Sequence, residues 1–224
     1  MICHKRLTFK RLFALFLFFK RAQIVLASTI IILLGSQNSF ASTDQIDGAN
    51  KLVTQMMIEV ESILAKDIND NSARRENVSA LFDRYFDLPT IAKFSAGPYW
   101  RAADADQKTA YKSAIRDVII GTVVRNFDQL SGLKFTATDS HAKGKKLVLV
   151  NGTFTDINQK QPPIMVGWRV VNADNASPLI LDVEIENISM LVTQKQENIA
   201  IIRKNEGKFA ALIDAMKQRS QSKN

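Results

Sequence analysis

The segment from Leu179 to Met190, which reads LILDVEIENISM, constrains the fold more than any other part of the chain. From Leu179 to Glu186 apolar and acidic residues alternate, and Ile180 is the one apolar residue on the acidic face. Such alternation predicts a strand with one buried face and one solvent-exposed face. The alternation then stops, and Thr193 with Gln196 matches the capping box that starts a helix. A sheet therefore gives way to a helix here, and its apolar face either closes a packed core or lines a pocket.

The first 41 residues have the composition of a secretory signal peptide. Six basic residues precede an apolar run from Ala22 to Leu34, and Ser39-Phe40-Ala41 supplies a small-residue cleavage site. The apolar run from Leu12 to Phe19 leaves an uncleaved anchor as the alternative, but neither run reaches the roughly 20 residues that span a bilayer. We therefore expect residues 1–41 to be removed by cleavage near Ala41. The only cysteine, Cys3, lies in this leader, so the mature chain is expected to form no disulfide.

Removal of the leader changes the charge of the chain. The full sequence has 30 basic and 22 acidic residues, but six basic residues lie in the leader, which leaves the mature part at a net charge of +2. A nucleic-acid partner requires a concentrated basic surface and is therefore not expected. The remaining 183 residues suit one domain, which we place at residues 42–220 with a polar tail at residues 221–224.

Periodicity predicts helices first, then strands, then helices. Apolar spacing indicates a helix over 44–66, a shorter one that stops near Phe86, another that restarts at Leu88-Pro89, and a long one over 104–130 that opens with the capping box of Asp104 and Gln107. Strands are expected at 134–139, 145–157, 164–171 and 179–186, with a turn from His141 to Lys146. Two helices follow, from Thr193 to Lys204 and around residues 209–216. The short connections between strands favour an α+β domain with a four-stranded antiparallel curved sheet wrapped by helices, a cone with an apolar interior.

Few side chains of the mature part are suited to catalysis. Its single histidine, His141, falls in the expected turn, and a metal site needs three or four convergent ligands. Asp182, Glu184 and Glu186 occupy one strand face, and an inward carboxylate could serve as a general base. The alternation instead favours a solvent-exposed face for these three residues. No metal and no cofactor are expected.

Aromatic residues are concentrated in one short stretch. Six of them lie between Phe82 and Trp100. Such a cluster forms either part of a core or the wall of a pocket for an apolar ligand, and composition alone does not separate the two.

Several of these motifs resemble one protein family. FDLPTIAKF at 86–94 followed by GPYWR at 97–101 resembles the toluene-tolerance, or MlaC, family of periplasmic phospholipid-binding auxiliary proteins of ABC transport. VGWRV at 166–170 and DVEIENISM at 182–190 are similar to further motifs of that family, and the likeness covers nearly all of the mature chain. The FDLPTIA, YWR and TQKQ stretches look closer to its hopanoid-associated HpnM branch. Asn187 replaces a glycine of the family, and its usual tyrosine is missing near 124–127.

The resemblance implies a non-enzymatic periplasmic carrier with a fold similar to nuclear-transport-factor-2-like cones. Acyl chains would lie between the sheet and the helices, with phospholipid as cargo and membrane-bound transport complexes of the inner and outer membrane as partners. Three alternatives remain open: a hopanoid or polyprenoid carrier of the same fold, a small cone-fold enzyme with an inward carboxylate base, and an interaction module with a solid core that has no cavity for an acyl chain.

The lipid-binding residues that we expect are apolar or aromatic and lie on the predicted helices and strands. Trp168 and Val183 should be neighbours on adjacent strands, and both should border the lipid. The full set is Phe82, Tyr85, Ile91, Phe94, Trp100, Tyr111, Ile115, Val118, Ile119, Val123, Phe127, Val166, Trp168, Val170, Leu181, Val183, Ile185 and Ile188.

Overall fold

The computed structural model describes residues 43–66, 71–144, 146–173 and 177–221. The expected signal peptide and its cleavage site near Ala41 lie outside the described residues. None of the described helices is both long and apolar enough to cross a membrane.

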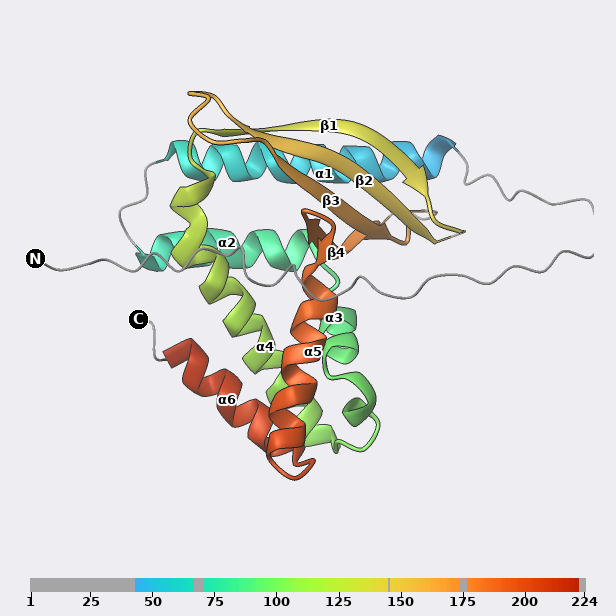
Figure 1. The fold of residues 1–224 in the computed structure, drawn as a ribbon, viewed down its shortest axis with the longest axis vertical. Helices are drawn as coiled ribbons and strands as arrows, with labels where there is room; N and C mark the ends of the chain where they lie inside the picture. The colour runs from blue at the N-terminus through green and yellow to red at the C-terminus, as the bar shows by residue number, and fades with distance from the viewer. Residues whose placement is uncertain (1–42, 67–70, 145, 174–176, 222–224) are drawn as a thin grey trace, which may run out of the picture. The chain divides into compact units, whose positions relative to one another are not determined.

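The predicted α+β class is confirmed. The helices before the sheet are α1 (Thr43–Ala65), α2 (Asn71–Tyr85), α3 (Leu88–Ser95) and α4 (Ala105–Asn126), with short 3-10 turns at Gly97–Trp100 and Phe127–Leu130. The strands are β1 (Leu133–Ala142), β2 (Leu147–Asp156), β3 (Ile164–Val171), β4 (Leu179–Ile185) and β5 (Ile188–Ser189), and α5 (Met190–Lys204) and α6 (Phe209–Gln221) follow. The strands pair antiparallel in chain order (Figure 1). The sheet therefore has five strands rather than the expected four, because a two-residue strand follows β4.

Helix starts follow the capping chemistry of the sequence. The Asp104 carboxylate accepts a hydrogen bond from the Gln107 N–H at 2.7 Å, and the Gln107 side chain accepts one from the Asp104 N–H at 3.2 Å, so the predicted capping box is confirmed. Asp87 caps α3 by accepting from the Thr90 N–H at 3.1 Å, with Pro89 in the first turn, where no N–H is needed. These caps fix where α3 and α4 begin.

The predicted start of α5 at Thr193 is wrong. Glu186 and Asn187 have φ of 50° and 64° and form a two-residue turn, after which Ile188 pairs with Ile185 in β5. Ser189 then caps α5 by accepting from the Val192 N–H at 3.0 Å. The helix starts earlier because a serine at the end of β5 already supplies the capping oxygen.

The predicted turn from His141 to Lys146 starts at Lys143 instead, because β1 is longer than its composition indicates and includes His141 and Ala142. After an irregularity between Ala137 and Ser140, β1 resumes its pairing, and His141 lies opposite Leu149. The extra strand residues pair with Val148 to Val150 of β2.

One face of the sheet, here called the inner face, is apolar and covered by helices. Val166, Trp168 and Val170 of β3 lie on it and are at most 7% exposed. Trp168 pairs with Val183, so their predicted adjacency is confirmed. The pairing of β3 with β4 shifts by one residue at Leu181, which brings Ile180 opposite Val170 on the inner face. This bulge explains the apolar residue that interrupts the acidic face of the sequence pattern.

Helices surround the sheet and pack into two hydrophobic clusters. α1 packs against β1 and β2, whereas α3 and α5 pack against β4 (Figure 1). We call the first group the sheet-facing cluster: Ala49, Val53, Met56, Met57, Val78, Leu81, Phe82, Tyr85, Phe86, Ile91, Ile120, Phe127, Val148, Val150, Val166, Trp168, Val170, Ala173, Ile180 and Leu191. We call the second the helical cluster: Ala92, Ala96, Ala103, Tyr111, Ala114, Ile115, Val118, Ile202, Phe209, Leu212, Ile213 and Met216. Ile119 of α4 packs against both.

Candidate functional site

The expected lipid-binding residues separate into three groups. Ten belong to the sheet-facing cluster or pack against it: Phe82, Tyr85, Ile91, Val123, Phe127, Val166, Trp168, Val170, Leu181 and Val183. Tyr111, Ile115 and Val118 belong to the helical cluster, Trp100 packs against it, and Ile119 lies between the two clusters. Phe94, Ile185 and Ile188 are exposed at the surface. The sequence pattern thus combined residues of two separate interiors and a surface.

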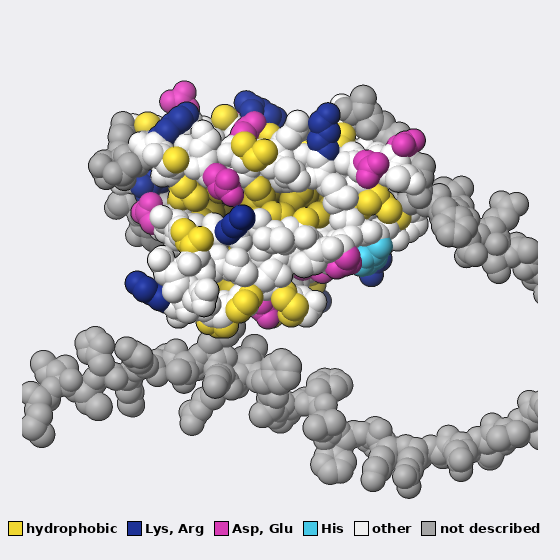
Figure 2. All heavy atoms as spheres, turned by 90° about the horizontal axis from the view of Figure 1, so that it is seen from above, with side chains coloured by type: hydrophobic (Ala, Val, Ile, Leu, Met, Phe, Trp, Pro, Cys, Tyr) yellow, Lys and Arg dark blue, Asp and Glu magenta, His cyan; other side chains and the backbone are white. Residues whose placement is uncertain are grey.

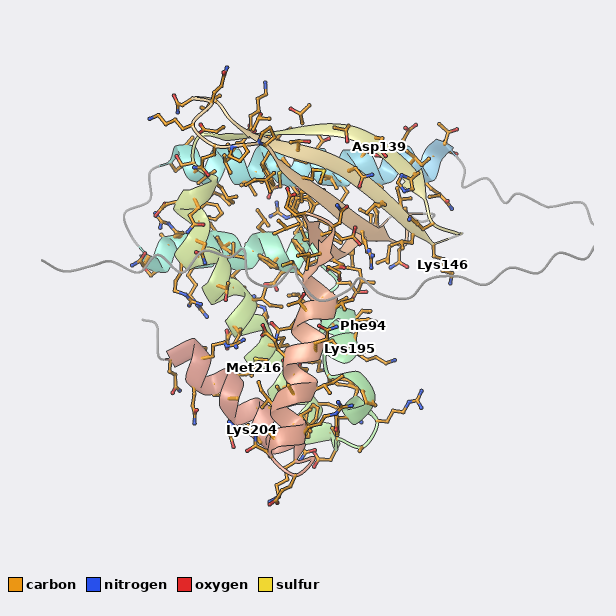
Figure 3. The ribbon with its side chains drawn as sticks, in the orientation of Figure 1. Phe94, Asp139, Lys146, Lys195, Lys204 and Met216 are labelled. Atoms are coloured by element: carbon orange, nitrogen blue, oxygen red, sulfur yellow. The ribbon has the colours of Figure 1, made fainter. Side chains whose placement is uncertain are left out.

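Phe94 lies at the surface, although an aromatic ring in an apolar run is more often buried. Its ring is 41% exposed, and the Lys195 Nζ lies 4.6 Å from its centroid (Figure 3). Such a cation–π contact joins α3 to α5 and favours a surface position for the ring. A contact between Phe94 and an acyl chain would therefore be made at the margin of the site.

A buried polar network joins the three helices around the helical cluster. The Asn198 Nδ2 donates to the Tyr111 hydroxyl at 2.8 Å and to the Ser95 carbonyl at 3.0 Å. The hydroxyls of Tyr111 and Ser95 are 2.8 Å apart, and Tyr111 donates in this bond because Ser95 donates to the Ala92 carbonyl. Burial raises the pKa of Tyr111 to about 12, so its phenol stays neutral. Hydrogen bonding inside this cluster is thus satisfied by the protein itself.

The sheet-facing cluster is organised around three aromatic rings on the inner face. The ring centroid of Phe135 lies 5.4 Å from that of Phe154 and 6.3 Å from that of Trp168, nearly perpendicular to the indole. Gly152 leaves room for the Phe135 ring, because a methyl group at position 152 would collide with that ring and lie 2.7 Å from the Thr136 carbonyl oxygen. The sequence interpretation missed Phe135 and Phe154. The available signal was Gly152 inside a strand, which often marks a close approach by a neighbour.

α1 is attached to the rest of the sheet-facing cluster by polar bonds. Glu59 of α1 accepts hydrogen bonds from the Tyr85 hydroxyl and the Arg84 guanidinium, both at 2.7 Å. The Ser140 hydroxyl of β1 donates to the Asn50 side chain of α1 at 2.6 Å. Seen from the side of α1 and β1, hydrophobic side chains form a visible band across the middle of the molecule (Figure 2). Apolar side chains are therefore exposed on this side of the molecule, close to these polar attachments.

The opposite, outer face of the sheet carries the carboxylates that were considered as catalytic. Asp182 is buried rather than solvent-exposed, so the prediction for this residue is wrong. It accepts from the Ser189 hydroxyl at 2.6 Å and from the Leu191 N–H at 2.9 Å, because the β4–β5 turn folds the start of α5 back onto it. Arg169 lies 3.6 Å from Asp182 and pairs with Glu184. These contacts hold β3, β4 and α5 together.

A depression of about 320 Å³ also opens on the outer face, beside β1 to β4. Asp139, Asn151 and Glu184 are among its lining residues. The Asn151 amide donates to Asp139 at 2.9 Å and lowers the pKa of that carboxyl, so Asp139 stays charged. Over the described ranges, no three His, Cys, Asp or Glu side chains are grouped so that they could hold a metal ion. This hollow lies on the opposite face of the sheet from the three aromatic rings.

Comparison with known proteins decides the family. The family model described as MlaC protein matches residues 36–218. The chain belongs to the MlaC family. The predicted resemblance is thereby confirmed for the family, whereas the HpnM branch and the boundaries at residues 42–220 stay predictions.

The fold of this MlaC-family chain is shared with a solved structure. A phospholipid-binding protein from Ralstonia solanacearum, solved in complex with a phospholipid, superposes with a TM-score of 0.63 and 18% identity over 80% of this chain and 98% of that chain. No curated protein sequence matches the chain significantly. The likeness to the solved structure shows that the curved sheet and its surrounding helices form the same fold.

Proposed function

We propose that this chain is a periplasmic lipid carrier that binds the acyl chains of a phospholipid at the sheet-facing cluster. Membership of the MlaC family supports this, as does the fold shared with a protein solved in complex with a phospholipid. The observation that carries the proposal is the inner face itself. Val166, Trp168, Val170 and Val183 line one side of a curved sheet, α1 packs against β1 and β2, and apolar residues of α1 and α2 belong to the same cluster.

Burial of hydrocarbon supplies the binding energy in this proposal. Each CH₂ group taken out of water is worth about 0.8 kcal/mol, so a long acyl chain needs few polar contacts to stay bound. Phe135, Phe154 and Trp168 offer large apolar surfaces for such a chain. Selectivity for the headgroup is expected to be low, because charged side chains of β3 and β4, such as Arg169 and Glu184, lie on the outer face.

The helical cluster has a structural role in this proposal. Tyr111, Ile115 and Val118 surround or adjoin a polar network that is complete without a ligand. An acyl chain inserted there would separate Tyr111 from Asn198 and leave buried polar groups unpaired, at a cost of about 1–3 kcal/mol each. The same chain inserted at the inner face displaces only apolar contacts. The sheet-facing residues are therefore the ones we assign to the lipid.

The proposal extends to transport. We infer that the leader is cleaved near Ala41, and that the mature protein shuttles lipid between membrane-bound complexes of the inner and outer membrane without catalysing a reaction. The carboxylates of the predicted acidic face support the non-enzymatic part, because Asp182 and Glu184 are engaged by Ser189, Leu191 and Arg169 on the outer face.

Mass spectrometry of organic extracts tests the proposed function. The full chain is expressed with its leader, and the protein is recovered from the periplasm without detergent. We expect an N-terminus near Ser42 and a stoichiometric phospholipid in the extract. Recovery of a hopanoid instead would move the assignment to the other lipid class. A lipid-free protein that also fails to take up labelled phospholipid would contradict the proposal.

A further inference from the structure

Trp168 carries a buried hydrogen-bond donor without a partner in the described part of the chain. The side chain lies in the middle of β3, between Val150 on β2 and Val183 on β4, and is 7% exposed. Its indole Nε1 is fully buried, and no described residue accepts its proton. Buried tryptophan N–H groups normally find an acceptor, because an unpaired one loses its hydrogen bond to water without a replacement. An exception of this kind indicates a site that is completed by something else.

The buried polar side chains of the described residues do not provide a hydrogen-bond acceptor for Trp168 on the inner face. The buried polar or charged residues of the described chain are Ser95, Asp182 and Asn198. Ser95 and Asn198 belong to the network of the helical cluster, and Asp182 points to the outer face, where it binds Ser189 and Leu191. Tyr85, the phenol of the sheet-facing cluster, directs its hydroxyl to Glu59. Ser140, which pairs with Val150 on the neighbouring strand, donates its hydroxyl to Asn50. The Trp168 N–H is thus left without an acceptor among the described residues.

We propose that the Trp168 indole N–H donates a hydrogen bond to an ester carbonyl oxygen of the bound lipid. This inference rests on the proposed function. The hydrocarbon part of an acyl chain has no hydrogen-bond acceptor. When the chains are buried, the ester carbonyl that joins each chain to glycerol is therefore the acceptor nearest to the apolar site. A phosphate group is a less suitable acceptor here, because its charge needs a cationic partner when buried, and Arg169 lies on the opposite face of β3.

The bond defines both the register of the lipid and its chemical class. An indole N–H only donates, so it favours a lipid with an ester carbonyl over a hydrocarbon, which has no acceptor, and over an ether lipid, whose ether oxygen is a weaker acceptor than a carbonyl. The ester is common to glycerophospholipids of every headgroup, so this contact selects acyl-ester lipids without selecting among headgroups. The site thus disfavours a polyprenoid hydrocarbon that leaves the N–H unpaired.

Matched ester and ether lipids test the inference. Delipidated mature protein is titrated with a fluorescent phospholipid, and a diacyl lipid and its dialkyl ether analogue of equal chain length and headgroup compete for the site. We expect the wild type to prefer the diacyl lipid by about 5-fold, the equivalent of one neutral hydrogen bond. Trp168→Phe should bring the two lipids within about 2-fold, and the control Trp100→Phe should keep the preference.

A second measurement on the folded protein with Trp168 intact covers the case in which Trp168→Phe fails to fold. The chain has two tryptophans, so Trp100→Phe leaves a single indole N–H resonance. That resonance should move downfield with the diacyl lipid and much less with the diether. Equal affinity for both lipids in the wild type, or a preference that survives Trp168→Phe, overturns the inference while lipid binding stands. Failure of both lipids to bind overturns the proposed function and the inference together.

Discussion

In the helical cluster the polar groups of Tyr111, Ser95 and Asn198 are hydrogen-bonded to one another. In the sheet-facing cluster the Trp168 N–H has no hydrogen-bond partner among the described residues. Both interiors are built from the same kinds of apolar residue. The part of α4 up to Val118 packs into the helical cluster, and the part from Ile120 packs into the sheet-facing cluster. The difference lies in how each interior treats its polar atoms. An interior whose polar atoms are all paired stabilises the fold, and we propose the other interior, with its unpaired donor on a curved apolar sheet, as the ligand site.

The largest expected effect is on the complete cluster. Asn198→Ala removes three hydrogen bonds, to Ser95, Tyr111 and Gln194, and leaves a small cavity. We expect the free energy of unfolding to fall by about 4 kcal/mol. Urea denaturation followed by circular dichroism measures the change, and Gln194→Ala, which removes only one of these bonds, should cost about 1 kcal/mol. Folded Asn198→Ala protein should still bind lipid. Loss of lipid binding by the folded variant would contradict a purely structural role for the helical cluster.

A charge on the inner face should act on the other cluster. Val183→Glu places a carboxylate beside Trp168, where desolvation costs about 3 kcal/mol if it stays ionised. We expect lipid retention to be lost, as quantified by mass spectrometry of detergent-free preparations. Glu184→Gln is the matched control, since residue 184 lies on the outer face and pairs with Arg169. Loss of lipid in the control but not in Val183→Glu would mean that the assigned faces are inverted.

Alkaline pH should weaken the helical cluster specifically. Burial raises the pKa of Tyr111 from 10.0 to about 12, so between these values the unfolded chain loses a proton that the folded chain keeps. Stability is therefore unaffected by this group below pH 10 and falls by up to about 3 kcal/mol as pH rises to 12. Denaturation at pH 9, 10, 11 and 12 measures this slope. Tyr111→Phe should flatten it, although burial also raises the pKa of Tyr85, so a smaller slope will remain.

A methyl group at position 152 should disturb only the aromatic rings of the inner face. Gly152→Ala forces Phe135 and the backbone of Thr136 to move, which we expect to cost about 2 kcal/mol and to weaken lipid binding. Gly144→Ala is a control for the loss of a glycine, because a methyl group there meets open space, although its φ of 73° adds local strain. Binding of fluorescent lipid should fall in Gly152→Ala alone, and equal losses in both variants would argue against a role for the Phe135 position.

Local patterns in the sequence predicted the faces of the elements well. Alternation located β3 at Ile164–Val171 and placed Trp168 beside Val183, and the Asp104 and Gln107 pair located the start of α4. These features depend on residues that are close in the sequence, so periodicity and capping motifs are enough to predict them.

Features that depend on distant parts of the chain were not predictable. Helical spacing placed Tyr111 and Phe127 on one stripe of the predicted helix over 104–130, but it could not show that they pack into different clusters. The burial of Asp182 follows from the turn at Glu186 and Asn187, which returns the start of α5 to β4. An alternating sequence pattern also does not show the bulge at Leu181, and this bulge determines that Ile180 lies on the inner face of the sheet.

Photo-crosslinking by a phospholipid with a photoreactive group in its acyl chain tests the central claim most directly. The loaded protein is irradiated and digested, and the labelled peptides are identified by mass spectrometry. We predict label on the inner-face residues around Phe135, Trp168 and Val183, and none on Ile115, Val118 or Phe209 of the helical cluster. Label concentrated on those three residues, with the inner face unmarked, would contradict the assignment of the lipid to the sheet-facing cluster.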